Sequence, residues 1–574
     1  MIRRSADFFG EYKMSMPKYH YPEPVKIQNR QWPDRVLTAP PIWMSVDLRD
    51  GNQALPIPMD VEKKLAYFNM LVKIGFKEIE VGFPSASQDD FDFCRRLIEG
   101  NLIPADVRIS VLTQARKHLI DRTVEALKGV HMATVHCYVA TSDLHGRFVF
   151  NCNRDQVMQL AADGTRMVRE AVENAGMRQI INYEFSPEEF TDSDIDFVID
   201  VCKKVKETWN PSRPGEFILN LPATVERRPP NQYADMIEYF CTHYPYMDQT
   251  IVSLHAHNDQ GCAVAATELA LLAGATRVEG TIFGHGERTG NLDLSILALN
   301  MHSRGIKTGL DFSNMPEIVR LIETASGIDV HPRHPYAGQL VFTAFSGSHQ
   351  DAIRKGMERR QEISEYFGQA WKVPYLHIDP ADVGATYENL IRINSQSGKG
   401  GVVYVLEKEF GIYPPKAMHP EIGHMVQDYM DKNGGEMDST ILKTLFDKNF
   451  VNISGPFQMT NYEREILAHE SGDRIGVSFT LDYNGHKVNL RDEGNGPIAA
   501  VVHALRQSVL VPSFELCDFS ERTMGSSASA KAIAFVGVSF GGSKELIYGV
   551  GVHSNIDRAA LAALFSALNR AVVR

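Results

Sequence analysis

The sequence has no closely spaced cysteines, no long apolar run and no excess of positive charge. Its seven cysteines are scattered, odd in number and never in a C-x-x-C pair, which disfavours a disulfide framework and a cysteine-rich zinc site. No apolar stretch approaches the roughly 20 residues that cross a bilayer, and Met1–Tyr21 lacks the apolar core of a secretory signal. The net charge of −12 argues against nucleic acid as a partner. We therefore expect a cytoplasmic protein that binds neither membrane nor nucleic acid.

A chain of 574 residues exceeds one compact core, so two to four domains are expected. From about residue 42 to 290, short β-rich runs alternate with helical patterns. In the first helical pattern, which Gly75 ends, the apolar residues that share one face are Val61, Leu65, Phe68 and Val72. The runs typical of strands are Ile42–Leu48, Glu78–Phe83, Arg108–Thr113, Ala133–Val139, Gln179–Phe185, Phe217–Leu221, Thr250–His255 and Arg277–Phe283.

These alternating units predict an α/β fold, a (β/α)8 TIM barrel, with a doubly wound open sheet as the alternative. Polar residues favour the barrel because they collect directly after the predicted strands, where barrel enzymes build their sites. A chain without such a site would scatter them through its loops. The residues are Arg49, Asp50, Ser85, His136, Glu188, Thr224, His255, His257, Glu287 and Asn291.

The C-terminal third changes pattern twice. From about 325 to 435 the alternation stops, which predicts a mostly helical connecting region. Later, a hairpin signal at Asn484-Gly485 and a following helix precede a similar strand–helix order that ends in a helix over Ile556–Val573. We interpret this as a degenerate repeat in a small α+β domain with a regulatory or dimerisation role. The expected divisions are an extension (1–40), the barrel (41–325), connecting subdomains that act as a lid and in dimer contacts (326–440) and a C-terminal domain (441–574).

Two histidines and one aspartate suggest a metal site. His255 and His257 follow one another at i and i+2 on the seventh strand, so they point to the same face. Imidazoles placed in this way suit a divalent metal, although a hydrogen-bonded histidine pair is the alternative. Asp50 follows the first strand, which in a closed barrel opens onto the same face. Two histidines and a carboxylate leave coordination positions free for a 2-oxo acid. Alone, Asp50 would read as a cap or turn residue.

Loops near this face offer further polar groups. Gly284–Asn291 contains three glycines, which allow close backbone approach to a ligand, and Asn291 offers a neutral oxygen to a metal. A plain β-to-α turn is the commoner explanation of such a loop. Thr224 can donate its hydroxyl to a substrate carboxylate. Asn394–Gly401 looks like a phosphate loop but fails the pattern, because Ile393 stands where glycine is required.

Taken together, the motifs closely resemble long-form α-isopropylmalate synthases, within the wider family of acyl-CoA-condensing and pyruvate-carboxylating TIM barrels. The resemblance runs from about residue 20 to the C-terminus. The segments that carry it are Asp47–Leu55, His255–Asp259, Gly286–Asn291, Ser346–Ala352, Val373–Leu376 and Gly494–Pro497.

The resemblance implies a reaction. Acetyl-CoA condenses with 2-oxoisovalerate, and thioester hydrolysis then releases CoA, at the entrance to leucine biosynthesis. It implies a divalent metal ion (Mg, Zn or Mn), a monovalent activator such as K, and leucine as feedback inhibitor. The metal ligands would be Asp50, His255, His257 and Asn291, and the groups lining the substrate pocket would be His136, Ser186, Glu188 and Thr224, with Thr224 holding the 2-oxo acid carboxylate.

The resemblance also implies which residues act in catalysis. Arg49 would polarise the keto group. His349 and Tyr375 would be a catalytic pair that is delivered to the partner subunit's barrel, which makes the homodimer part of the site. Histidine suits a base near neutral pH, so His349 ranks first as the base and Glu188 second.

Other functions remain open at this point. Homocitrate and citramalate synthases share the metal site and differ in the side-chain pocket, while a retro-aldol lyase would not carry this C-terminal domain. A different class, an amino-acid sensor with a vestigial barrel, conflicts with the intact polar residues. Two departures from the family stand out: His285 occupies a position where asparagine is expected, and Phe519–Thr523 differs from the leucine-sensing pattern.

Overall fold

The computed structural model describes residues 21–344, 346–385, 399–433, 437–467, 474–524, 530–543 and 545–573. The first 20 residues and Asn394–Gly398 lie outside these ranges. The chain forms two compact units. One contains the residues up to Val341 together with Pro380–Ala385, and the other contains Phe342–Asp379 and the residues from 386 onward.

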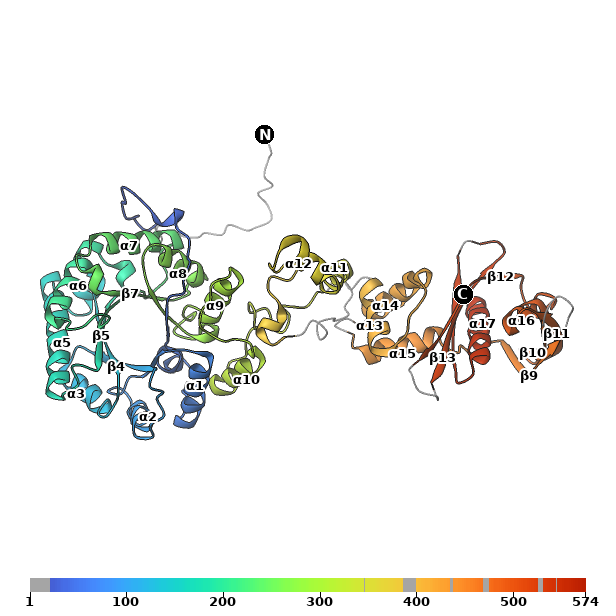
Figure 1. The fold of residues 1–574 in the computed structure, drawn as a ribbon, viewed down its shortest axis with the longest axis horizontal. Helices are drawn as coiled ribbons and strands as arrows, with labels where there is room; N and C mark the ends of the chain where they lie inside the picture. The colour runs from blue at the N-terminus through green and yellow to red at the C-terminus, as the bar shows by residue number, and fades with distance from the viewer. Residues whose placement is uncertain are drawn as a thin grey trace. The chain divides into compact units, whose positions relative to one another are not determined.

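Eight parallel strands close into a barrel in chain order, which confirms the TIM barrel and rules out the open sheet (Figure 1). The closure is made where β8 pairs with β1, with Arg277 opposite Ile42. The strands are β1 (Ile42–Ser45), β2 (Glu78–Gly82), β3 (Arg108–Gln114), β4 (Ala133–Ala140), β5 (Ile181–Glu188), β6 (Phe217–Ala223), β7 (Ile251–Ala256) and β8 (Arg277–Gly280).

Helices surround this barrel (Figure 1). The α-helices are α1 (Val61–Ile74), α2 (Gln88–Glu99), α3 (Lys117–Ala126), α4 (Asp143–Phe148), α5 (Arg154–Asn174), α6 (Ile195–Trp209), α7 (Pro230–His243), α8 (Ala263–Leu272), α9 (Leu294–Ser303) and α10 (Met315–Ser326). Short helices are η2 (Trp32–Asp34), η4 (Phe190–Asp192), η5 (Met247–Gln249), η6 (Ile282–Gly284), η7 (Pro380–Val383) and the π-helical η3 (Asp47–Gly51).

Helix α1 ends at Gly75 as predicted, because this glycine adopts φ 117° and caps the helix. Its buried face is rotated from the predicted one, since Val61, Leu65 and Val72 are only half-buried. Lys64 and Tyr67 are buried instead. The Lys64 ammonium pairs with Asp90, and the Tyr67 hydroxyl donates to Asp47. The spacing of apolar residues cannot predict that polar side chains such as Lys64 and Tyr67 are buried, because their burial depends on hydrogen-bond and charge partners elsewhere in the fold.

Two predicted strands were too long. The first strand ends at Ser45 and the chain turns into η3, and the eighth ends at Gly280 and turns into η6. The Asp47 carboxylate accepts from the backbone N–H of Ile282 at 3.0 Å, so it ties the two turns together. Apolar residues such as Leu48 continue the β pattern but are buried inside the turn. These turns bring Asp50 onto the C-terminal face of the barrel.

The second unit begins with helices and ends in two small sheets. Its helices are α11 (Gly347–Glu358), α12 (Arg360–Phe367), α13 (Lys399–Phe410), η9 (Lys416–Met418), α14 (His419–Asn433), α15 (Ser439–Phe450), α16 (Pro497–Arg506) and α17 (Ile556–Val573). One sheet has the order β11-β10-β9 and the other β12-β13-β14. The strands are β9 (Phe457–Leu467), β10 (Arg474–Tyr483), β11 (His486–Gly494), β12 (Phe514–Met524), β13 (Lys531–Phe540) and β14 (Ile547–His553).

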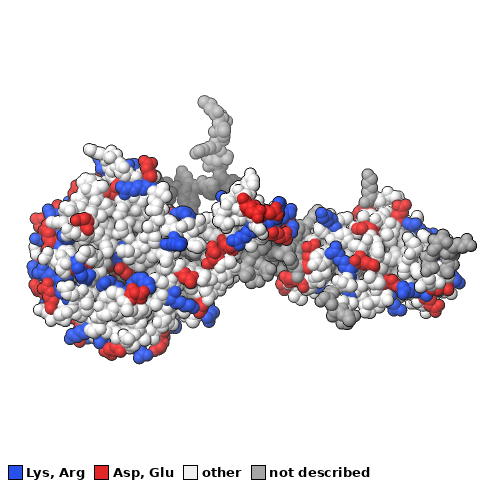
Figure 2. Space-filling view, viewed as in Figure 1, with Lys and Arg blue, Asp and Glu red and all other residues white. Residues whose placement is uncertain are grey.

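The predicted repeat is present as two halves, each with three strands followed by one helix, which confirms the α+β domain. The turn at Asn484-Gly485 is flanked by the paired residues Tyr483 and His486. Helices α16 and α17 share one apolar core with the central strands β10 and β13. The prediction missed β9 and β12, because these edge strands carry mostly exposed polar residues. On the face drawn in Figure 2, basic and acidic side chains are interspersed over both units.

Candidate active site

Polar side chains converge at the C-terminal ends of the barrel strands around a cavity of about 360 Å³. Most of the barrel residues predicted for the site contribute to its wall, as the position after each strand led us to expect. The lining residues are Arg49, Asp50, Gln53, Phe83, Leu112, His136, Tyr138, Ser186, Glu188, Asn220, Pro222, Thr224, His255, His257, Glu287 and Arg288.

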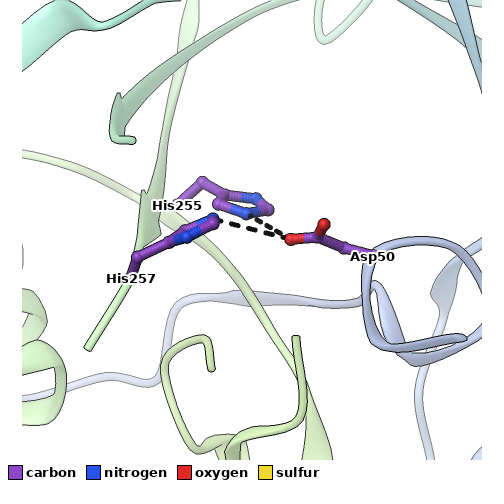
Figure 3. Close-up of side chains that lie close together, drawn as sticks. All are labelled: Asp50, His255 and His257. Carbon is purple, nitrogen blue, oxygen red and sulfur yellow. Dashed lines mark hydrogen bonds and ion pairs between the residues drawn. The ribbon is translucent and has the colours of Figure 1, made fainter. Parts of the chain in front are cut away.

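Asp50, His255 and His257 form a buried cluster at this cavity (Figure 3). The Asp50 Oδ2 atom lies 3.2 Å from Nε2 of His255 and 3.6 Å from Nε2 of His257. Asp50 comes from η3 and the histidines from the end of β7, and both rings point toward the carboxylate in Figure 3. Two nitrogens and one oxygen placed in this way are ligands that a divalent transition metal accepts.

Asn291 completes the cluster from the loop after β8. Its Nδ2 donates to Asp50 Oδ2 at 2.8 Å, and its Oδ1 is buried with no hydrogen-bond partner among the described residues. A buried carbonyl oxygen without a partner costs about 1–3 kcal/mol. A cation beside Asp50 would provide a partner for that oxygen, so this donor set fits a metal.

The two histidines are prepared to different degrees. His255 turns Nδ1 toward the Glu279 carboxylate at 3.0 Å, so its Nε2 faces Asp50, on the side where a metal would bind. His257 instead accepts at Nδ1 from the Arg288 guanidinium at 2.7 Å, so the neutral ring carries its proton on Nε2. If His257 binds a metal through Nε2, its proton must move to Nδ1, and Arg288 then keeps its other partners, Asp259 and the backbone oxygen of Thr224.

Buried charges determine the protonation of the cluster. Burial acts to raise the pKa of Asp50, but the Arg49 guanidinium and the two histidines outweigh it and hold this pKa well below its usual range. Burial also opposes the shift at Glu80, yet Arg49 and His136 lower its pKa to about 2. For His255, burial lowers the pKa, while hydrogen bonds to Asp50 and Glu279 raise it to about 9. Asp50 and Glu80 therefore stay ionised.

Arg49 and His136 form the polar wall next to the cluster. The Arg49 guanidinium lies 3.1 Å from Asp50 Oδ1 and also donates to Glu80, so it is held at the cavity by two carboxylates. His136 contacts the same Glu80 through Nδ1 at 2.9 Å and Ser186 Oγ through Nε2 at 2.7 Å. The wall thus presents the fixed positive charge of Arg49 beside the polar groups of His136 and Ser186.

Thr224 and Glu188 lie on the remaining sides. Thr224 Oγ1 accepts from the backbone N–H of Glu189 at 2.9 Å, which leaves its own hydroxyl hydrogen available to a ligand. Glu189 adopts φ 59°, a left-handed conformation that is strained for a residue other than glycine. Burial raises the pKa of Glu188. Glu188 is the last residue of β5, and Thr224 directly follows β6.

His349 and Tyr375 form a pair within the second unit. Their rings stack with centroids 3.9 Å apart and planes 21° from parallel. His349 is exposed, and Tyr375 is 64% exposed with φ 61°. The structure therefore brings the predicted pair together, while their place at a barrel site stays a prediction. His285 is half-buried, burial lowers its pKa, and its backbone oxygen accepts from Thr281 Oγ1.

Several residues around the site were missed in the sequence. They are three buried glutamates on the barrel strands and Arg277. One glutamate contacts His136 and Arg49, another contacts His255, and the third bonds Arg277. The signal was available, because charged residues inside β-rich runs at inward positions are unusual. The glutamates are Glu80, Glu184 and Glu279.

Comparison with known protein families assigns the class first. The HMGL-like family model matches residues 40–322, the barrel. A model described as α-isopropylmalate synthase, post-catalytic domain-like, matches residues 339–407, and one described as LeuA allosteric (dimerisation) domain matches residues 437–572. The barrel and its histidine–carboxylate cluster thus belong to an HMGL-like enzyme with an allosteric, dimerisation-type C-terminal domain.

Full-length relatives narrow the class. The 2-isopropylmalate synthase of Clostridium acetobutylicum is 46% identical over 560 residues, which cover 96% of this chain and 99% of that protein. The 2-isopropylmalate synthase of Schizosaccharomyces pombe is 46% identical over 572 residues, covering 98% and 97%. The chain belongs to the 2-isopropylmalate synthase family of acyltransferases, which confirms the predicted resemblance. No helix in the described ranges combines the length and apolarity needed to cross a bilayer.

Proposed function

We propose that this chain condenses acetyl-CoA with 2-oxoisovalerate and hydrolyses the thioester, giving 2-isopropylmalate and CoA for leucine biosynthesis. The observation that carries the proposal is the buried cluster of Asp50, His255 and His257 at the mouth of a barrel from this family. A 2-oxo acid offers a keto and a carboxylate oxygen, and a metal with three or four protein ligands has positions free for both.

The metal would be Mg, Zn or Mn, held by Asp50, His255 and His257, with Asn291 as a further ligand. When bound, it supplies a Lewis acid for the keto oxygen of the substrate. The buried amide oxygen of Asn291, which has no hydrogen-bond partner among the described residues, and the Nε2 atom of His255, which faces Asp50, support this set. A monovalent ion such as K is proposed as an activator on the family resemblance alone.

The chain's own polar groups would bind and orient the 2-oxo acid. Arg49 would face the keto oxygen and stabilise the negative charge that develops there, since Glu80 and Asp50 already fix its guanidinium. Thr224 would donate its hydroxyl to the substrate carboxylate. The rest of the pocket would be lined by His136, Ser186 and Glu188, which border the same cavity.

A base must remove a proton from the acetyl methyl group before the carbon attacks the keto carbon. We propose that His349 from the partner subunit takes this proton at its imidazole, with Tyr375 beside it, and that Glu188 is the second candidate. The stacking of two exposed rings supports this pair, and so does the strained backbone of Tyr375, because such strain gathers at functional sites. The dimerisation-type domain supports a homodimer.

The remaining parts of the proposal concern organisation. We propose divisions at residues 41–325 for the catalytic barrel, 326–440 for the connecting subdomains that act as a lid and in dimer contacts, and 441–574 for a domain through which leucine inhibits. The allosteric description of the matching C-terminal model supports the last role. A cytoplasmic location fits a biosynthetic enzyme of this family.

The test follows CoA release with a thiol reagent. Purified full-length protein receives acetyl-CoA and 2-oxoisovalerate, pyruvate, 2-oxobutanoate or 2-oxoglutarate, each with and without chelator and leucine. We expect the fastest turnover with 2-oxoisovalerate, its loss with chelator and its inhibition by leucine. A preference for pyruvate or 2-oxoglutarate would assign citramalate or homocitrate synthesis instead. No turnover by metal-replete protein would favour the amino-acid sensor.

A further inference from the structure

A network of buried charges lies inside the barrel, below the predicted metal cluster. At its centre, Arg277 on β8 has no solvent exposure. Its guanidinium donates to both oxygens of Glu184 at 3.2 and 3.1 Å, to Glu279 Oε1 at 2.5 Å and to Glu78 at 2.7 Å. A buried arginine with this many carboxylate partners can fix their positions, because its planar fork binds them directionally.

Glu279 connects this network to the cluster. Its Oε1 atom accepts from Arg277 and from Ser253 Oγ at 2.9 Å. Its Oε2 atom faces Nδ1 of His255 at 3.0 Å and Nδ2 of Asn220 at 3.2 Å. Neighbours on β6, β7 and β8 thus hold both oxygens of the carboxylate. The arrangement directs Oε2 of Glu279 at Nδ1 of His255, the ring nitrogen that faces away from Asp50.

We propose that Glu279 is a positioning residue for the metal site, held in place by Arg277 and Ser253. It keeps the proton of His255 on Nδ1 and aims Nε2 at the position beside Asp50. This inference rests on the proposed function, in which His255 is a metal ligand. A carboxylate behind a ligating histidine fixes the tautomer and the ring orientation, and losing it typically lowers metal affinity 10- to 100-fold.

The same residues raise an alternative. His136, Glu184 and Glu279 have ligand atoms close enough together to hold an ion of their own. Arg277 already neutralises two of these three groups through direct hydrogen bonds. A cation there would have to displace the guanidinium or share its partners. We therefore assign the cluster to support of the first site, which predicts one bound divalent ion per chain.

The experiment measures Mn²⁺ binding to the metal-stripped full-length protein by isothermal titration calorimetry. Glu279→Gln keeps the size of the side chain and should weaken the affinity about 10- to 100-fold. Glu184→Gln is the matched control, because Glu184 is equally buried and bonds both Arg277 and Glu279, but it lies on β5 and the described contacts give it no hydrogen bond to His255. Glu184→Gln should leave the Mn²⁺ affinity within about twofold of that of the unmodified protein. It should lower the unfolding temperature of the metal-free protein about as much as Glu279→Gln does.

A milder variant covers the case in which Glu279→Gln does not fold. Ser253→Ala removes a neutral donor to Glu279 Oε1, and it should weaken Mn²⁺ binding roughly 3- to 10-fold by loosening the carboxylate. Unchanged affinity in Glu279→Gln, or in Ser253→Ala where only that variant folds, would overturn the inference. An equal loss in Glu184→Gln, or a second bound equivalent that both glutamine variants remove, would also overturn it.

A third variant separates this inference from the proposed function. His255→Ala should abolish tight Mn²⁺ binding if His255 is a ligand. If His255→Ala binds Mn²⁺ as well as the unmodified protein does, the proposed metal site is wrong. If His255→Ala loses the ion and Glu279→Gln retains it, the metal site stands and only the positioning role of Glu279 is wrong.

Discussion

The barrel cluster and the His349–Tyr375 pair are built in opposite ways. Asp50 and His255 are buried, and each is held by further buried polar groups. His349 and Tyr375 stack on one another and are exposed. A preorganised, water-excluded group is ready to act within its own unit. An exposed pair gains the same environment only when another surface covers it, which is why we propose that the pair works in a partner's barrel.

The largest expected effect breaks the barrel side of this comparison. Asp50→Asn keeps the shape of the side chain but removes the ionised oxygen that lies closest to both histidines. We expect loss of tight Mn²⁺ binding and a fall in kcat/KM of about 10³-fold or more, because the Lewis acid contributes several kcal/mol. Calorimetry and the CoA-release assay measure the two effects. A variant with intact affinity and activity would remove Asp50 from the ligand set.

The next largest effect concerns the exposed pair. His349→Ala should lower kcat about 10²-fold, the usual range for a general base, with Mn²⁺ affinity unchanged. Co-expressing His349→Ala with Asp50→Asn then tests the partner arrangement. Random pairing yields half heterodimers with one intact site of two, so about a quarter of the original activity should return. Activity that stays at the level of the single variants would mean that Asp50 and His349 of the same subunit act in one site.

The smallest effect sharpens the comparison through pH. Burial raises the pKa of Asp47, the first residue of η3, to about 7. Between about pH 4 and 7 the unfolded chain has lost this proton while the folded chain keeps it, so folding stability falls as pH rises. Asp47→Asn should remove this pH dependence, so the stability of the variant relative to the unmodified chain should rise by about 2–4 kcal/mol between pH 4 and 8. The loss of one acceptor for Ser45, Tyr67 and Ile282 adds a constant, pH-independent cost. Thermal unfolding across this range measures the difference.

A substitution at an exposed aspartate serves as a control for the direction in which folding stability changes with pH. The pKa of Asp106 is lowered by its hydrogen bond to Lys77, so Asp106→Asn should show a small change in the opposite direction. Stability curves for Asp47→Asn and the unmodified chain that run parallel with pH would mean that Asp47 stays ionised when buried.

Much of the fold could be predicted from the sequence. Eight apolar runs and their spacing predicted a closed barrel, and the two-residue turn at Asn484-Gly485 predicted a hairpin. The predicted metal ligands could be found for a different reason: His255 lies near the end of the seventh strand, His257 directly follows that strand, and barrel closure brings Asp50 to them. The network under the cluster was not predicted. The inward position of Glu279 in a β-rich run was a signal of a buried charge, but its hydrogen bond to Arg277 is known only from the folded barrel. Hydrophobic patterns carry no information about polar partners inside a core.

The closing seam of the barrel has one more consequence. Asp50 and His255 are separated by 205 residues, and Asn291 follows the last strand. During synthesis the chain therefore cannot bring these predicted ligands together until the eighth strand has been made and has paired with the first. An ion bound by Asp50 and His255 would link two points of the chain that are 205 residues apart. It would therefore stabilise the closed barrel against separation of β1 from β8. Cofactor loading would then be the step that marks a finished barrel.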